Sequence, residues 1–366
     1  MRALHVAAGN LYGGVERIVV EIGRARGTWT HEVALAFPGR AARELDAEGA
    51  IRHDVGAVRF SRPLTVWRAR HAIKRLLRDR AYDAVVCHSP WSYALAAPRS
   101  HGLPRVLWAH DALNGAHWTE KRVARLPPDV VICNSQFTAA SIRTWLPAVR
   151  TEVLYAPVSD PAVHDANARA SIRAELTTPD QAMVIVIASR YERWKGHDVL
   201  LDAVARLRGA WRLWVAAGAQ RDGEAEYARE LQRRAAELGI ADRVRFLGAR
   251  DDVPRLLRGA DVLCQPNTAP EPFGIAFVEA LYAARPVVTS DAGGAREIVT
   301  NACGLLVAPG DTPALAAALQ RLLDAPDLRH ALGAHGPARA RALCDPSTQV
   351  RQLESVLASC RPVLVA

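Results

Sequence analysis

Two glutamates eight positions apart are the side chains best placed to do chemistry in this sequence. Glu271 and Glu279 frame the segment Pro270–Leu281, whose Pro-Phe-Gly turn predicts that a helix opens at about Gly274. Glu271 is expected in the loop and Glu279 inside an otherwise apolar helix. Because an unpaired buried carboxylate is costly, Glu279 needs hydrogen-bond donors such as a pair of hydroxyl groups. Backbone N–H groups at the start of such a helix, as at Ile275, are free to bind phosphate or sugar oxygens.

Two cations follow an expected strand at Val184–Ala188. The segment Ser189–His197 carries Arg190 and Lys195, which together can hold about two negative charges, as on a diphosphate. The simpler alternative is a pair of solvated surface cations. The position after a strand favours the first interpretation, since open parallel sheets bind ligands beyond the carboxyl ends of their strands.

Two Gly-Gly pairs stand at expected helix starts. Gly13-Gly14 follows the first strand, and Gly293-Gly294 follows a late one. Glycines let a backbone approach a ligand closely, and a helix N-terminus attracts anions. The first pair lacks the G-x-G-x-x-G pattern of dinucleotide-binding proteins. An ordinary tight turn is the alternative for that first pair.

His110 ends another expected strand, Arg105–His110. A lone histidine usually packs or caps, but this position favours ligand contact.

Metal binding is not expected, because no D-x-D motif is present and Asp251-Asp252 more readily caps a helix. The six cysteines form no C-x-x-C pair, which predicts scattered reduced thiols and a cytoplasmic protein.

Strands and helices alternate along all 366 residues, which predicts parallel sheets with right-handed crossovers. The pattern yields twelve strands, too many for one doubly wound domain, and a Pro/Ser/Asp-rich linker at 156–165. The predicted fold class is therefore α/β, with two Rossmann-like domains facing a central cleft. We expect an N-terminal domain at 1–156 and a second at 157–344. A helix at about 345–366 is expected to pack back on the first.

The positive charge belongs to the first half of the chain. Residues 1–150 hold 22 basic and 12 acidic side chains, against 25 and 26 in residues 151–366. Much of the excess lies at 59–80, where Val66, Trp67 and Ile73 recur at helical spacing. A solvated surface helix is one interpretation, and a surface that meets anionic lipid at the inner membrane face is the other. No nucleic-acid motif accompanies it, no apolar run is long enough to span a membrane, and Met1–Gly9 is interpreted as a strand rather than an export signal.

The order of these motifs resembles the family-4 retaining glycosyltransferases of the GT-B fold. The resemblance rests on Gly13-Gly14, on Arg190 with Lys195-Gly196, on the Glu271/Glu279 pair and on Gly293-Gly294. It implies transfer of a sugar from a UDP- or GDP-linked donor, held mostly by the C-terminal domain. It also implies an acceptor that is a glycan, a glycolipid or lipid-linked, in envelope polysaccharide or glycolipid synthesis.

The resemblance also implies roles. Glu279 would bind the ribose, and Arg190 and Lys195 the diphosphate. Glu271 would contact the donor sugar beside the backbone of Phe273, Gly274 and Ile275. Gly14, next to Gly13, would let its loop close on the diphosphate, His110 would lie near the transferred sugar, and the segment containing Gly248 would frame the base. Attack and departure on the same sugar face, with no divalent metal or other cofactor, are the implied mechanism.

The sequence departs from the family at one point and leaves two other functions open. Many members show Asn-Gly after the last strand of the first domain, where this chain has Ala156-Pro157. Trp118 is a candidate for stacking on an acceptor sugar. A nucleotide-sugar 2-epimerase uses the same fold without transfer, and a non-catalytic nucleotide-sugar binder would show no turnover.

Overall fold

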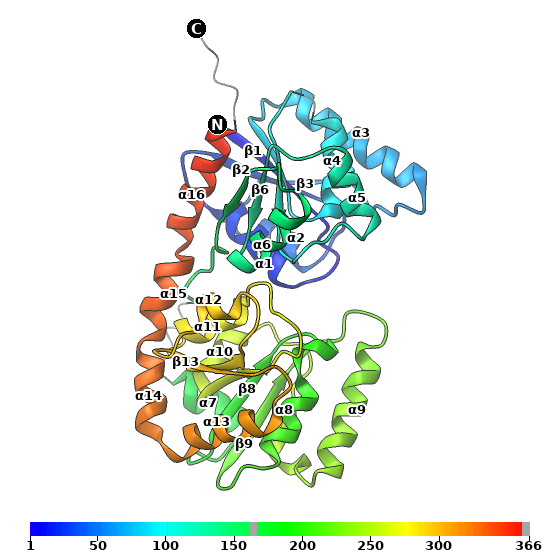
Figure 1. Cartoon of the computed structure of the whole chain (residues 1–366). Coiled ribbons are helices and arrows are strands. Elements are labelled where there is room, and N and C mark those ends of the chain that lie inside the picture. Colours follow the sequence, from blue (N-terminus) through cyan, green and yellow to red (C-terminus); the bar gives the residue numbers. More distant parts are fainter. Residues whose placement is uncertain (101, 162–166, 361–366) are drawn as a thin grey trace. The chain divides into compact units, whose positions relative to one another are not determined.

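The computed structural model describes residues 1–100, 102–161 and 167–360, and the chain forms two compact units. The first comprises Met1–Ser159 together with Cys344–Ala366, and the second comprises Asp160–Leu343. The last helix, α16 (Pro346–Ser359), thus belongs to the first unit (Figure 1). Residues 162–165 of the expected linker and 361–366 of the expected final helix lie outside the described part.

A seven-stranded parallel sheet forms the first unit, in the order β3-β2-β1-β4-β5-β6-β7. Its helices are α1 to α6 and α16, with a short 3₁₀ turn at Ala97–Arg99. The strands are β1 (Arg2–Ala7), β2 (Thr30–Leu35), β3 (Arg52–Asp54), β4 (Ala84–Cys87), β5 (Arg105–Ala109), β6 (Val130–Cys133) and β7 (Thr151–Val153). The helices before α16 are α1 (Gly14–Arg24), α2 (Arg40–Ala47), α3 (Pro63–Asp79), α4 (Pro90–Ala96), α5 (Trp118–Arg125) and α6 (Gln136–Trp145).

The edge strand β3 is missing from the sequence prediction. Its three residues, Arg52-His53-Asp54, are all polar, so they give no apolar signal. Pairing with β2 holds them in place, with Val33 opposite Arg52. A short charged strand is a usual way to end a sheet, because it discourages pairing with other chains.

Helix α3 confirms the predicted basic helix and shows which of its residues are buried. It begins with a proline in its first turn, a favoured position, and buries Val66, Ala69 and Ile73. Trp67 does not join that face. It lies one residue, or about 100° of helix rotation, from Val66 and is 61% exposed.

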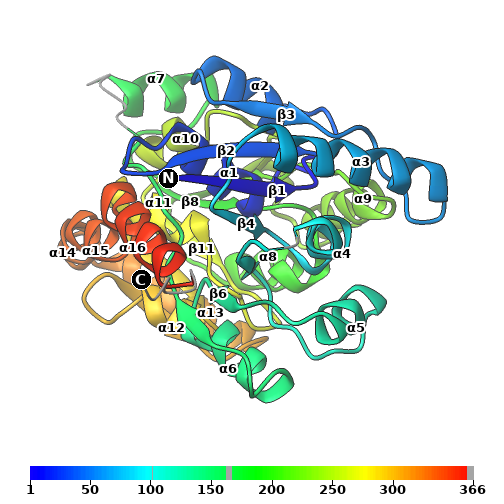
Figure 2. The same cartoon turned by 90° about the horizontal axis from the view of Figure 1, so that it is seen from above.

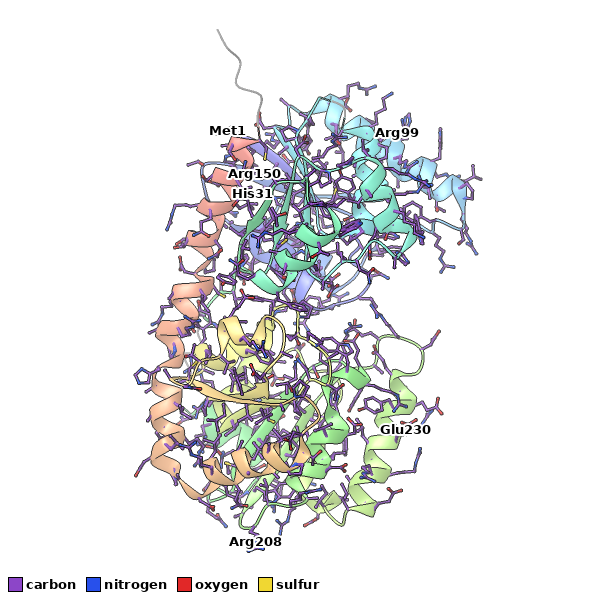
Figure 3. The ribbon with its side chains drawn as sticks, in the orientation of Figure 1. Met1, His31, Arg99, Arg150, Arg208 and Glu230 are labelled. Carbon is purple, nitrogen blue, oxygen red and sulfur yellow. The ribbon has the colours of Figure 1, made fainter. Side chains whose placement is uncertain are left out.

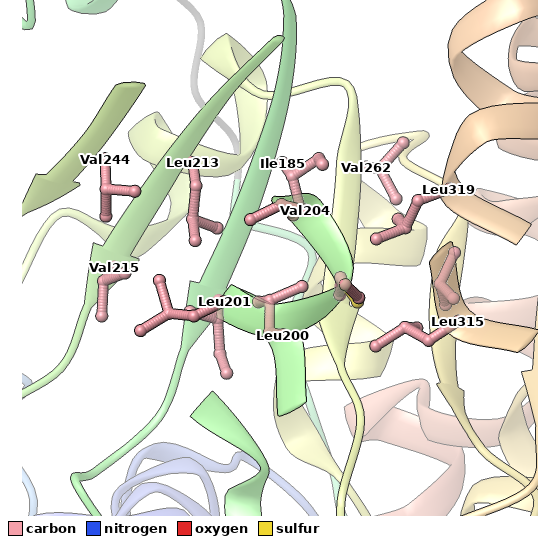
Figure 4. Packing of buried hydrophobic residues seen from close by; sticks show 14 of the residues in the cluster. Ile185, Leu200, Leu201, Val204, Leu213, Val215, Val244, Val262, Leu315 and Leu319 are labelled. Carbon is pink, nitrogen blue, oxygen red and sulfur yellow. The ribbon is translucent and has the colours of Figure 1, made fainter. Parts of the chain in front are cut away.

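The second unit has a six-stranded parallel sheet in the order β10-β9-β8-β11-β12-β13. Its core packs α8 and α13 against β8 and β9, through residues such as Leu200, Val204, Leu213 and Leu319 (Figure 4). The strands are β8 (Met183–Ala188), β9 (Trp211–Ala216), β10 (Val244–Phe246), β11 (Val262–Gln265), β12 (Val287–Ser290) and β13 (Gly304–Val307). The helices are α7 (Ala168–Glu175), α8 (His197–Val204), α9 (Glu224–Glu237), α10 (Val253–Gly259), α11 (Ile275–Tyr282), α12 (Ala295–Ile298), α13 (Thr312–Asp324), α14 (Pro326–Ala334) and α15 (Gly336–Cys344), with 3₁₀ turns at Arg193–Lys195 and Ala241–Arg243.

Both sheets reverse their strand order beside their first strand. In the first unit β1 lies between β2 and β4, and in the second β8 lies between β9 and β11. Loops that follow such strands leave toward opposite faces of the sheet, which opens a place for a ligand at the carboxyl edge. No helix in the described residues is both long and apolar enough to cross a bilayer. All six cysteines, which the described ranges include, are free thiols, as predicted.

Candidate functional site

Three loops meet at the carboxyl edge of the second sheet. They follow the neighbouring strands β8, β11 and β12 and cover residues 189–196, 266–274 and 291–294. The Thr268 N–H donates to the Trp194 carbonyl at 2.8 Å, and the Gly294 N–H donates to the Glu271 carbonyl at 2.7 Å. A parallel bridge also joins Glu271 to Gly293. The loop that carries Glu271 is therefore fixed on both sides by backbone contacts.

Glycines make this close approach possible. Gly196 and Gly293 have φ of 73° and 67°, in the left-handed region. A Cβ at Gly196 would lie 2.0 Å from the Pro266 carbonyl oxygen, and one at Gly294 would lie 2.4 Å from that of Pro272. The Gly293-Gly294 pair is thus required by packing against the glutamate loop, which the sequence alone did not reveal.

Glu271 is the centre of the loop cluster and is only 7% exposed. Its Oε2 accepts hydrogen bonds from Lys195 Nζ at 2.8 Å, Gln265 Nε2 at 3.0 Å and Asn267 Nδ2 at 2.8 Å. Within the described residues no donor reaches Oε1, which leaves that oxygen to accept from a hydroxyl group. The sequence analysis missed Gln265 and Asn267. Their signal is two amides at and just beyond the end of a buried strand.

Lys195 is held from two directions. Besides its ion pair with Glu271, its Nζ lies 3.8 Å from the centre of the Trp194 ring. A cation over an indole face is stabilised by the ring quadrupole. The side chain is 14% exposed, so a charge close to it is only weakly screened by water.

Arg190 lies apart from this pair. Its guanidinium contacts Glu192 at 2.6 Å and Glu224 at 3.5 Å. In the described part of the chain it makes no contact with Lys195 or Glu271, so the structure does not bring the two expected cations together. Its side chain is 24% exposed and can exchange these carboxylates for another anion by rotation.

The predicted helix start is confirmed. Gly274, with φ of 104°, is the N-cap residue of α11, directly after buried Phe273, and Ile275 is the first helical residue. Glu279 is 2% exposed within this otherwise apolar helix, as expected from the sequence. Gly248 follows β10 in open space, since an added Cβ would meet no atom within 4 Å.

In the first unit, Gly13 is the N-cap residue of α1 and Gly14 its first residue. The Gly13 N–H donates to Glu16 Oε2 at 3.1 Å. This helix start therefore already holds a carboxylate of its own, and Glu16 has to be counted in any account of anion binding there.

His110 directly follows β5 and is 8% exposed. Burial lowers its pKa to about 3, so the imidazole is neutral at physiological pH. Its Nε2 lies 3.1 Å from Nδ1 of His88, which is hydrogen-bonded in turn to His5. The sequence analysis singled out His110 but missed its histidine partners. Their signal is the occurrence of single histidines in or just after otherwise apolar strands.

Two Rossmann-like units, each with a doubly wound parallel sheet, define the GT-B class of fold. The model for Glycosyltransferase Family 4 matches residues 12–160, and the model for Glycosyl transferases group 1 matches residues 168–339. The chain belongs to these family-4-like GT-B glycosyltransferases.

Two relatives match along nearly the whole chain, and a third matches about half of it. The lipopolysaccharide core biosynthesis glycosyltransferase LpsD of Rhizobium meliloti (strain 1021) is 29% identical over 92% of each chain. Anabaena Alr3699/HepE, solved in complex with UDP-glucose, aligns with a TM-score of 0.87 and 26% identity, covering 98% of this chain and 100% of that one. The phosphatidyl-myo-inositol mannosyltransferase of Mycobacterium leprae is 36% identical over 51% of this chain and 50% of its own length.

Proposed function

We propose that this glycosyltransferase transfers a sugar, with retention of its anomeric configuration, from a nucleoside-diphosphate sugar to a glycolipid or lipid-linked acceptor. The observation that carries the proposal is the Lys195–Glu271 pair at the point where strand order reverses in the second sheet. There a cation and a carboxylate with one open oxygen stand side by side. A sugar diphosphate needs both, since its phosphates require positive charge and its hydroxyls require an acceptor.

The chemistry breaks the bond between the anomeric carbon and a phosphate oxygen. The electron pair leaves with the diphosphate, so the transition state is stabilised mainly where negative charge collects. Lys195 supplies charge in a fixed position, and Arg190 adds a second cation once it leaves its two glutamates. Fixed cations of this kind stabilise departing charge without the reorganisation that water requires. The departing phosphate oxygen takes the proton of the acceptor hydroxyl, which attacks from the same face.

The ribose, the sugar and the base of the donor are each assigned to residues whose chemistry suits them. Glu279 accepts hydrogen bonds from the ribose hydroxyls, and Glu271 Oε1 accepts from the sugar, next to the α11 start at Gly274. Gly248 leaves room for the base, and His110 contacts the transferred sugar. The solved complex of HepE with UDP-glucose supports a uridine nucleotide as the first donor to try.

The acceptor is assigned to the first unit, which carries the positive charge. Burial lowers the pKa of Arg70, and the charges of Arg122 and Arg99 lower it further. An acceptor phosphate would relieve the repulsion among these three arginines. Trp118 packs edge-on against Phe60 and is 41% exposed, which suits stacking on a sugar. Relatives named for lipopolysaccharide core and phosphatidyl-inositol glycosylation support this acceptor class.

Helix α3 fits the surface of an anionic membrane. Leu64 and Trp67 are 71% and 61% exposed, and Arg68, Lys74 and Arg75 beside them are exposed as well. An exposed tryptophan between cations is typical of helices that lie at the lipid headgroup level.

We expect the protein to float with anionic vesicles at low salt and to stay behind with neutral ones. Replacing Leu64 and Trp67 together by serine should abolish flotation without unfolding, since neither side chain is buried. The matched control is Ile51→Ser, which changes an exposed apolar residue outside α3. Equal recovery with neutral and anionic vesicles, or full flotation of the double variant, would exclude this membrane contact.

Nucleoside diphosphate release and product analysis test the function itself. With UDP- and GDP-sugars and a lipid-linked acceptor, we expect diphosphate release, a retained linkage by NMR and unchanged rates in EDTA, because the site's own cations bear the charge. An epimer formed from donor alone would make the protein an epimerase. Tight donor binding with no product from any acceptor would make it a binding protein.

A further inference from the structure

Four histidines form a continuous hydrogen-bonded row across the first sheet. They lie on or just after four neighbouring strands, in the order β2, β1, β4, β5. Figure 2 shows the first three of these strands side by side. His31 Nδ1 is 3.0 Å from His5 Nε2, His5 Nδ1 is 3.0 Å from His88 Nε2, and His88 Nδ1 is 3.1 Å from His110 Nε2. Every link joins Nδ1 of one ring to Nε2 of the next.

The strand register produces this row. His5 stands opposite Val33 on β2 and opposite Val86 on β4. His31 lies two residues before Val33, and His88 lies two residues after Val86. Alternate residues of a strand share one face, so the rings climb diagonally across a single face of the sheet. The row starts near the beginning of β2 and ends at the carboxyl edge, where His110 lies.

The row is buried along its whole length. His5 and His88 are 0% and 1% exposed, on a face otherwise packed with apolar residues. Burial lowers the pKa of both rings well below the ordinary value, and neighbouring histidines lower it further. Trp108 stacks on His88 and His110, with centroids 5.3 and 5.6 Å away, which fixes the ring planes. Four neutral imidazoles therefore share three hydrogen bonds.

Glu354 of helix α16 lies next to His31, at the end of the row opposite His110. Its Oε1 lies 3.5 Å from His31 Nε2, close enough for an ion pair, although that nitrogen has no hydrogen-bond partner in the described structure. Figure 3 shows His31 beside α16. The same carboxylate accepts from the backbone N–H groups of Thr28 and Trp29 at 3.2 and 3.0 Å, and from the Thr28 hydroxyl at 2.6 Å. Although burial acts to raise its pKa, these hydrogen bonds hold the pKa of Glu354 below its ordinary value, so it is ionised at neutral pH.

A carboxylate at one end gives the row a direction. An ionised carboxylate can only attract a proton, so the negative charge 3.5 Å from His31 Nε2 favours the form of His31 with its proton on Nε2 and a bare Nδ1 toward His5. A neutral imidazole has one donor and one acceptor nitrogen, and the same choice therefore passes to His5, His88 and His110. The opposite direction would set two acceptors, His31 Nε2 and the carboxylate, against each other. At the far end, His110 Nδ1 has no partner in the described structure.

We propose that Glu354 fixes all four histidines as Nε2–H tautomers, so that His110 offers its Nδ1 lone pair to a hydroxyl of the bound sugar. Glu354, His31, His5 and His88 are then positioning residues for His110. The contact with sugar rests on the proposed function, whereas the tautomer of the row does not.

Nitrogen NMR of the histidine rings tests the tautomer directly. In neutral buffer without substrate, one-bond and long-range ¹H–¹⁵N correlations distinguish Nε2–H from Nδ1–H. We expect the Nε2–H form for His5, His31, His88 and His110 in the wild-type chain. An Nδ1–H form at any of these four positions would overturn the inference.

Two variants test the origin of the direction. Glu354→Met removes the carboxylate at similar volume, and His31→Phe cuts the row while Glu354 keeps its bonds to Thr28 and Trp29. Each should let His5, His88 and His110 populate the Nδ1–H form. Thr28→Val, which removes one donor to Glu354 without changing its charge, should leave the tautomers as in wild type. A uniform Nε2–H row in folded His31→Phe would exclude control by Glu354.

Turnover measurements separate this inference from the proposed function. In Glu354→Met and in His31→Phe we expect kcat to fall roughly tenfold, as for the loss of one hydrogen bond, while KM for the donor is unchanged. Sugar transfer by a wild-type protein whose histidines show mixed tautomers would overturn the tautomer inference without affecting the proposed function. Uniform Nε2–H histidines in a protein that transfers no sugar would overturn the proposed function without affecting the tautomer inference.

Discussion

Replacing Lys195 by methionine should lower kcat for sugar transfer by about 10²–10³-fold, the usual effect of removing one preorganised donor to developing charge. Methionine keeps an unbranched apolar stem and removes the ammonium group that lies over the Trp194 ring and donates to Glu271. The bond to the leaving phosphate has to break without the cation that Glu271 holds in place at 2.8 Å. Initial rates of nucleoside diphosphate release at saturating donor measure the effect.

The matched control is Lys74→Met, which removes a lysine charge from the exposed face of α3. It should leave kcat unchanged with a soluble acceptor. Glu271 still has Gln265 and Asn267 as donors in the Lys195 variant, so the loop should stay folded, as a melting curve would show. A Lys195→Met enzyme with wild-type kcat would remove Lys195 from the mechanism.

Replacing Glu279 by glutamine should weaken UDP binding by about 10–100-fold, because a hydrogen bond to a charged group contributes about 1.5–3 kcal/mol. The ribose would lose its ionised acceptor, whereas the phosphates would keep their cations. Titration calorimetry with UDP measures the loss. Glutamine has nearly the same shape, which is necessary because Glu279 is 2% exposed in α11.

Inorganic pyrophosphate is the internal control for this variant, since it lacks the ribose. It should bind the wild-type protein and Glu279→Gln equally well. Equal weakening of UDP and pyrophosphate would mean that Glu279 supports the loop cluster rather than the nucleoside. Unchanged UDP binding would show that Glu279 does not contact the ribose.

The order of elements in this chain could be predicted because it rests on local patterns. Apolar runs such as Met183–Ala188 alternate with turns and amphipathic helices, and the Pro-Phe-Gly turn marks the start of α11. The start of α11 and the burial of Glu279 were predicted correctly for the same reason. β3 was not predicted, because its three polar residues form a strand only through pairing with β2.

The partners of each site residue could not be predicted, because they come from other strands. Arg190 and Lys195 are close in sequence, yet Lys195 pairs with Glu271 across β8 and β11, and Arg190 pairs with Glu192 and Glu224. The histidine row depends on register between four strands, which no local pattern contains. The exposure of Trp67 could not be predicted, because helical spacing alone does not show which side of a helix packs against a neighbour.

Hydrogen exchange with and without UDP tests most directly whether a nucleoside diphosphate binds where the three loops meet. The expected result is slower exchange in residues 189–197, 266–276 and 291–297, with α3 unchanged. Protection by UDP confined to other segments, with these loops exchanging at their free rate, would contradict the donor site and the transfer mechanism built on it.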